Sequence, residues 1–171
     1  MRHWVLATAA VIAAVAMGAG TAQAGKVEIK GAHVCCGNCV KAITGILAKV
    51  DGVSDPAAAK GGSITFTTKD DKTTTAALTA LADGGFAGTA TDDGKETKVD
   101  LGSASGKADE VTVTMTHICC GMCKAAIVGL FPDAKVSFAS DNTTATLKGK
   151  DLDKAAVLES LHKAGFNGTI K

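Results

Sequence analysis

The sequence contains one short pattern twice, and this repeat constrains the fold more than any other feature. Residues 33–39 read His-Val-Cys-Cys-Gly-Asn-Cys, and residues 117–123 read His-Ile-Cys-Cys-Gly-Met-Cys. Further along, residues 85–89 and 165–169 share the pattern Gly-Phe-x-Gly-Thr. Such self-similarity is typical of a duplicated structural unit. With five Phe, one Trp and no Tyr, the chain is poorly supplied for one thick core, so we predict two small domains.

The pattern of apolar residues predicts that each repeat begins with a strand and a helix. Residues 27–29 and 111–113 alternate apolar and polar side chains, as half-buried strands do. After each cysteine pattern, apolar residues recur at helical spacing. These residues are Val40, Ile43, Ile46, Leu47 and Val50 in the first repeat and Ala126, Ile127 and Leu130 in the second.

The rest of each repeat predicts two strands, a second helix and a final strand. Residues 64–67 and 144–147 are Thr-rich and alternate with a period of two, which predicts a strand in each repeat. In the second repeat, residues 136–138 predict a further strand before it. The corresponding signal in the first repeat, near residues 56–59, is weak. The second helices carry Leu78 and Leu81, or Val157, Leu158 and Leu161. This order predicts an α+β protein with two ferredoxin-like βαββαβ domains, each an antiparallel sheet with two helices on one face.

The predicted organisation has four parts: a signal peptide at 1–24, a first domain at 25–91, a linker at 92–109 and a second domain at 110–171. The linker is rich in Gly, Ser, Lys and Asp, which favours flexibility, although Val99 and Leu101 could extend a strand. The N-terminal segment joins Arg2, a short apolar stretch and the triplet Ala22-Gln23-Ala24, which is typical of a secretory signal. We therefore expect a periplasmic or secreted protein; a retained N-terminal anchor is the alternative.

The charge balance argues against binding to polyanions. The chain has 18 Lys plus Arg, and removing Arg2 with the signal leaves 17, which equals the 17 Asp plus Glu. Both signs are interspersed, so no basic face for nucleic acid is predicted. No stretch after the signal is apolar enough to span a membrane, so the mature form is expected not to be membrane-spanning.

All six cysteines lie in the two repeated patterns, whereas a disulfide framework usually spreads its cysteines along the chain. A Cys-x-x-Cys at the start of a helix places two thiols close together, and the helix N-terminus favours the thiolates that soft metals bind. The predicted metal ligands are Cys36, Cys39, Cys120 and Cys123, joined by Cys35, Cys119, His33 and His117.

The exact ligand set stays open at this stage. Three thiolates suit trigonal Cu(I), Hg(II) or Pb(II), and an added imidazole gives the Cys₃His set of tetrahedral Zn(II). Adjacent residues of an extended segment point in opposite directions, which argues against Cys35 and Cys36 facing one ion. We expect one ion per repeat; alternatively, both loops share a single ion among six thiols.

These motifs resemble the heavy-metal-associated domain family, which includes copper chaperones, metal-pumping P-type ATPases and the periplasmic mercury-binding protein. The two family cysteines fall on Cys36 and Cys39, and on Cys120 and Cys123 in the second repeat. Val34 replaces the family's buried methionine, as does Ile118, and an extra Cys precedes the pair. The resemblance implies a metallochaperone or scavenger for Cu(I), Zn(II) or a toxic thiophilic ion such as Hg(II), working with a metal-transporting membrane protein or another metallochaperone.

Two other readings remain. The Cys-x-x-Cys pairs could rest as disulfides in an oxidising compartment, or they could serve a thiol–disulfide oxidoreductase, which also places this motif at a helix start. The sequence contains none of the common hydrolase or phosphate-binding motifs. We therefore expect a binding protein with no enzymatic activity.

Overall fold

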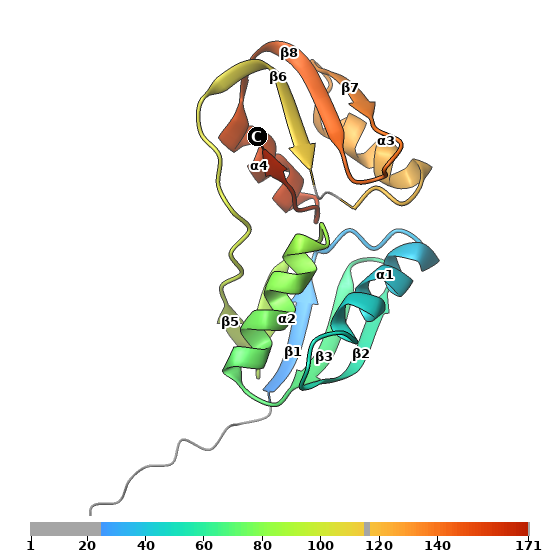
Figure 1. Cartoon of the computed structure of the whole chain (residues 1–171), viewed down its shortest axis with the longest axis vertical. Helices are drawn as coiled ribbons and strands as arrows, with labels where there is room; N and C mark the ends of the chain where they lie inside the picture. The colour runs from blue at the N-terminus through green and yellow to red at the C-terminus, as the bar shows by residue number, and fades with distance from the viewer. Residues whose placement is uncertain (1–24, 115–116, 171) are drawn as a thin grey trace, which may run out of the picture.

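Two antiparallel sheets and four helices make up the α+β chain in the computed structural model, which describes residues 25–114 and 117–170 (Figure 1). The predicted signal peptide at 1–24 lies outside the described residues. The first half contains β1 (Gly25–Lys30), α1 (Gly37–Leu47), β2 (Val53–Ala59), β3 (Ser63–Thr68), α2 (Asp71–Asp83), β4 (Thr89–Asp92) and β5 (Lys95–Thr97). The second half contains β6 (Lys107–Thr114), α3 (Gly121–Leu130), β7 (Lys135–Phe138), β8 (Ala145–Asp153), α4 (Lys154–Lys163) and β9 (Thr169–Ile170).

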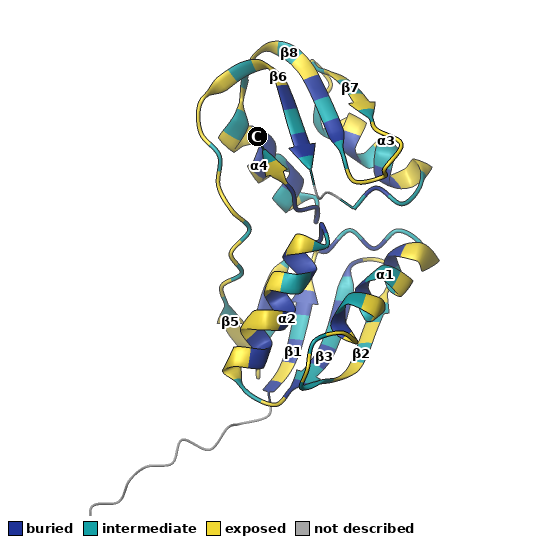
Figure 2. Ribbon diagram, viewed as in Figure 1, coloured by how far each residue is buried: buried dark blue, intermediate teal, exposed yellow. Residues whose placement is uncertain are grey.

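The first strand of each half lies inside its sheet. The strand order is β2-β3-β1-β4-β5 in one sheet and β7-β8-β6-β9 in the other. The predicted alternation therefore has a structural role: Val27 pairs with Phe66 and Ile29 with Ile64, and all four side chains are buried. Figure 2 shows buried residues along β1 and β6, the strands that lead into the two cysteine loops. This arrangement is compatible with two ferredoxin-like domains.

Helix α1 places a cysteine at the end of its buried face. Cys39, Ile43 and Leu47 are the buried residues of α1, and they recur every four positions. Helix α3 buries Cys123 and Ile127 in the same way. Because Cys39 and Cys123 belong to the apolar faces of their helices, packing of the core fixes where their thiols lie. Val50, which the periodicity assigned to the first helix, lies beyond its end at Leu47.

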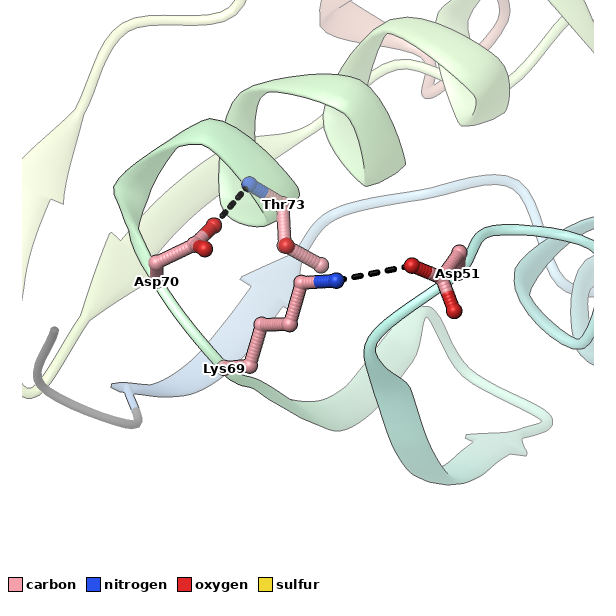
Figure 3. A network of polar contacts seen from close by, with 4 residues as sticks. All are labelled: Asp51, Lys69, Asp70 and Thr73. Atoms are coloured by element: carbon pink, nitrogen blue, oxygen red, sulfur yellow. Dashed lines mark hydrogen bonds and ion pairs between the residues drawn. The ribbon is translucent and has the colours of Figure 1, made fainter.

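Helix α2 begins with a capping interaction that its sequence supplies. The Thr73 backbone amide donates to Asp70 Oδ1 at 2.7 Å, and the neighbouring Lys69 Nζ donates to Asp51 Oδ2 at 2.7 Å (Figure 3). Hydrogen bonding from the Thr73 side chain and backbone lowers the pKa of the Asp70 carboxyl. An aspartate at this position satisfies a helix amide that has no partner within the helix.

The region predicted as a linker contains more regular structure than its composition suggests. Residues 95–97 form β5, which pairs with β4 through Thr91 and Glu96, and β6 already begins at Lys107. The intervening residues 98–106 form neither helix nor strand. In the part of the chain that the structure describes, no helix is long and apolar enough to cross a membrane.

Candidate metal centre

The two halves meet through the loops that follow their second helices. Phe86, after α2, forms an antiparallel bridge with Phe166, after α4. Its two hydrogen bonds run from the Ala87 amide to the Gly165 carbonyl at 3.1 Å and from the Asn167 amide to the Gly85 carbonyl at 2.9 Å. The repeated Gly-Phe sequence therefore forms a junction in which equivalent segments of the two halves pair with each other.

Each histidine of the cysteine pattern packs against a phenylalanine ring from the other half, stacked for His33 and tilted for His117. The His33 ring lies 4.1 Å from the Phe166 ring, and the His117 ring lies 4.6 Å from the Phe86 ring, measured between centroids. The His33 amide also donates to the Gly165 carbonyl at 3.1 Å. Both Nε2 atoms are buried and have no hydrogen-bond partner among the described residues. Burial lowers the pKa of both imidazoles, which favours their neutral form.

This junction brings the two cysteine loops face to face, and all six cysteines form one group, here called the six-thiol cluster. Across the halves, Cys35 Sγ lies 3.5 Å from Cys123 Sγ and 3.7 Å from Cys120 Sγ. In the reverse sense, Cys119 Sγ lies 3.5 Å from both Cys36 Sγ and Cys39 Sγ. All six cysteines are free thiols. The cluster is therefore built equally from both repeats.

The spacing of these sulfurs suits a soft metal ion. Tetrahedral zinc bound at about 2.3 Å by four thiolates would hold neighbouring sulfurs about 3.8 Å apart. Within each Cys-x-x-Cys, the two Sγ atoms lie 3.8 Å apart, both for Cys36 with Cys39 and for Cys120 with Cys123. Two groups of four cysteines have ligand atoms within 4.8 Å of one another and could hold a metal ion. The groups are Cys35, Cys39, Cys119 and Cys123, and Cys35, Cys36, Cys119 and Cys120.

The thiols of the cluster differ in acidity because their surroundings differ. Hydrogen bonds from the Cys39 backbone and the Cys119 thiol lower the pKa of Cys36 to about 6. The pKa of Cys120 is also lowered, chiefly by the Cys123 backbone. Burial instead raises the pKa of Cys35 and Cys119. Cys36 and its equivalent are therefore the thiols most readily deprotonated in the metal-free protein.

The more acidic thiols lie where solvent reaches the cluster. An open depression of about 500 Å³ is lined by Cys36, Cys120 and their neighbours, namely Gly37, Asn38, Gly121 and Met122. Cys39 and Cys123, in contrast, are fully buried. An ion arriving from solvent would meet the readily ionised sulfurs first. Met122, half-exposed at the rim, is one of the few exposed large apolar side chains among the described residues.

The structure brings together all six predicted cysteine ligands and gives the predicted histidines a different environment. Neither His33 nor His117 belongs to the two four-cysteine groups found among the described residues. Both imidazoles lie in the junction instead, against phenylalanine rings. The pairing of Phe86 with Phe166 at this junction was not predicted, although the repeated Gly-Phe sequence was the signal that could have revealed it.

The extra cysteine of each pattern also has a clear place. Both adjacent thiols face the partner loop: Cys35 Sγ contacts the thiols of Cys120 and Cys123, and Cys36 Sγ contacts the thiol of Cys119. Cys35 and Cys36 also belong to one group of four cysteines whose ligand atoms lie within 4.8 Å of one another, so the extended backbone does not keep these two thiols from facing one site. Val34 and Ile118 are buried beneath the loops.

Fold and site together define an α+β protein with two antiparallel sheets and a shared cysteine cluster that could hold a metal ion. No family model and no curated protein matches this sequence.

Proposed function

We propose that this chain is an exported soft-metal-binding protein, a metallochaperone or scavenger, whose metal site is the six-thiol cluster. The observation that carries the proposal is the convergence of three thiols from each repeat, with cross-loop sulfur separations of 3.5–3.7 Å. Gathering six free thiols in one place is suited to metal binding, since thiolates are preferred ligands of soft ions. The proposed metals are Cu(I), Zn(II) or a toxic thiophilic ion such as Hg(II).

The arrangement of elements supports a relationship to heavy-metal-associated domains. In each half the elements follow the order strand, helix, two strands, helix, strand, with β5 added at the end of the first half, and the cysteine loop joins the first strand to the first helix. We propose that both halves are ferredoxin-like domains of this kind. The open depression at Cys36 and Cys120 would let a metal-transporting membrane protein or another metallochaperone reach the outer thiols.

Anaerobic titration of the reduced mature protein with Cu(I) and Zn(II), against chelators of known affinity, tests the proposal. We expect tight binding and, in metal-edge absorption spectra, a ligand shell of sulfur, because the imidazoles are engaged with Phe86 and Phe166. Replacing Cys36 and Cys39 with Ser should impair the whole site, since both repeats supply it. Binding that survives in the unaltered repeat would instead indicate independent sites, and binding of neither metal would refute the proposal.

A thiol–disulfide oxidoreductase is the second candidate, favoured by the pKa of about 6 at Cys36 beside the buried Cys39. A partly exposed, acidic thiol three residues before a buried one is the arrangement that attacks substrate disulfides. Reduction of a model disulfide substrate by the metal-free protein, abolished by Cys36→Ser, would favour this candidate. Equal, slow exchange by the wild type and the variant would exclude it.

A further inference from the structure

The six-thiol cluster consists of three pairs, each with one cysteine from either half. The inner pair, Cys39 and Cys123, is fully buried. The outer pair, Cys36 and Cys120, lines the open depression. The third pair, Cys35 and Cys119, is here called the shared pair because both four-cysteine groups contain it. One group adds the inner pair and the other adds the outer pair.

The distances around the shared pair show that it lies between the other two. Cys35 Sγ is 3.6 Å from Cys39 and 3.5 Å from Cys123 on the inner side, and 3.7 Å from Cys120 on the outer side. Cys119 Sγ shows the mirrored set, at 3.5 Å from Cys39, 3.7 Å from Cys123 and 3.5 Å from Cys36. Each shared thiol therefore contacts both members of the inner pair and one member of the outer pair.

Four sulfurs at such separations suit one four-coordinate ion. The cluster contains two such groups, and the sulfurs of Cys35 and Cys119 belong to both. A thiolate sulfur has enough lone pairs to bond two metal ions at once. One ion in either group would leave two thiols of the cluster without a ligand role. Two ions would use all six.

We propose, resting on the metal-binding function above, that the cluster holds two soft metal ions bridged by the sulfurs of Cys35 and Cys119. The inner ion is bound by the shared and inner pairs, and the outer ion by the shared and outer pairs. Two divalent ions bound by six thiolates leave the cluster with a net charge of −2. A single ion with six thiolates would leave −4. The N-termini of α1 and α3, which begin at Gly37 and Gly121, face this negative charge favourably.

The arrangement accounts for the extra cysteine that each loop carries before its Cys-x-x-Cys. The two Cys-x-x-Cys pairs alone supply four thiols, but among the described residues both groups that bring four cysteine ligand atoms within 4.8 Å of one another include Cys35 and Cys119. Cys35 and Cys119 are the additional sulfurs that a second ion needs, and their central position allows each to serve both ions. The two ions also differ in access, because only the outer pair borders the depression.

Loading the reduced mature protein with cadmium-113, a spectroscopic substitute for Zn(II), tests the inference. Native mass spectrometry is expected to show two Cd(II) ions per chain. Cadmium-113 NMR is expected to show two resonances with scalar coupling to each other, because coupling is transmitted through a shared sulfur. One bound ion with thiolate charge-transfer absorption would overturn the two-ion proposal and leave the metal-binding function intact. Two uncoupled resonances would likewise overturn the proposal of a shared sulfur. If no Cd(II) were bound, both the two-ion proposal and the metal-binding function would be refuted.

Two matched double variants separate the shared pair from the outer pair. Cys35→Ser with Cys119→Ser is expected to lose tight binding of both ions, because each ion keeps only two thiols. Cys36→Ser with Cys120→Ser is expected to keep one tightly bound ion, held by the four remaining thiols. If each repeat bound its own ion, both variants would remove one thiol from each site and behave alike, which would contradict the proposal. Circular dichroism of both variants checks that the fold is retained.

Discussion

At the scale of single residues, the thiol pKa values of adjacent cysteines in the same loop are shifted in opposite directions. Cys36 lies at the start of α1 and receives hydrogen bonds that favour its thiolate, whereas burial disfavours the thiolate of Cys35. The sequence Cys-Cys alone says nothing about this difference. It arises because one side chain faces a helix N-terminus and the solvent-facing depression, and the other lies between the two loops.

Alkylation of the reduced, metal-free protein should reveal this difference. With its pKa lowered to about 6, Cys36 is a thiolate above that pH and a thiol below it, so its reaction with iodoacetamide should rise with pH around a midpoint near 6. Cys35 should remain largely unmodified at pH 7. Mass spectrometry of the digested protein measures both sites. A midpoint near the ordinary value of 9 for Cys36 would contradict the prediction, and bound metal should protect both residues.

At the scale of secondary-structure elements, the helices fall into two kinds according to how they begin. Helices α2 and α4 are capped by Asp70 and Asp153, whose carboxylates accept hydrogen bonds from backbone amides. Helices α1 and α3 begin instead after Cys36 and Cys120. The backbone at the starts of α1 and α3 lowers the pKa of these two cysteines, whereas α2 and α4 are capped by aspartate side chains.

The cap of α2 should make stability depend on pH in a defined direction. The pKa of Asp70 is lowered in the folded protein, so its stabilising effect is complete above the ordinary value of 3.8 and is lost as the pH falls through the folded pKa. Asp70→Ala should therefore lower the thermal midpoint by a few degrees at pH 7, and this difference should shrink in acid. Asp70→Asn is the matched control, because it keeps a capping oxygen without a titrating charge. A difference that does not change with pH would contradict the role of the carboxylate.

At the scale of the whole molecule, the junction between the halves decides whether the cysteines form one cluster or two separate loops. Gly165 is at the tightest point of this junction, with a φ of +83°, and a Cβ there would collide with the Gly31 carbonyl and the His33 amide. The bridge between Phe86 and Phe166 and the two imidazole stacks surround this contact. The meeting of the two cysteine loops therefore depends on residues other than the cysteines themselves.

Gly165→Ala should separate the two cysteine loops and weaken metal binding by about tenfold or more, since the collision involves backbone atoms that cannot turn away. Gly94→Ala is the matched control, because Gly94 also has a positive φ, of 78°, but open space around its Cα. The control should lose about 1–2 kcal/mol of stability, the cost of a side chain at positive φ, and bind metal normally. Competition titration and small-angle scattering measure affinity and compactness. Equal affinity in both variants would show that the junction is not needed.

The sequence by itself determined the duplicated α+β organisation and all six sulfurs of the site. Strand and helix periodicity is a local property, so the predictions around Val27, Ile43 and Leu81 needed no tertiary information. The cysteine patterns likewise indicated a cluster that could hold a metal ion, because thiols at a helix start favour soft metals wherever the loop is placed.

Only the tertiary structure decided that the two patterns form a single cluster. Their separation in the chain is bridged by the pairing of Phe86 with Phe166, a long-range contact that leaves no periodic signal in the sequence. At the same contact, the imidazoles of His33 and His117 pack against phenylalanine rings of the opposite half, an environment that the sequence did not predict. The central position of the Cys35 and Cys119 sulfurs results from this contact between the two halves. The contact depends on the shapes of both surfaces, and one repeat contains only one of them.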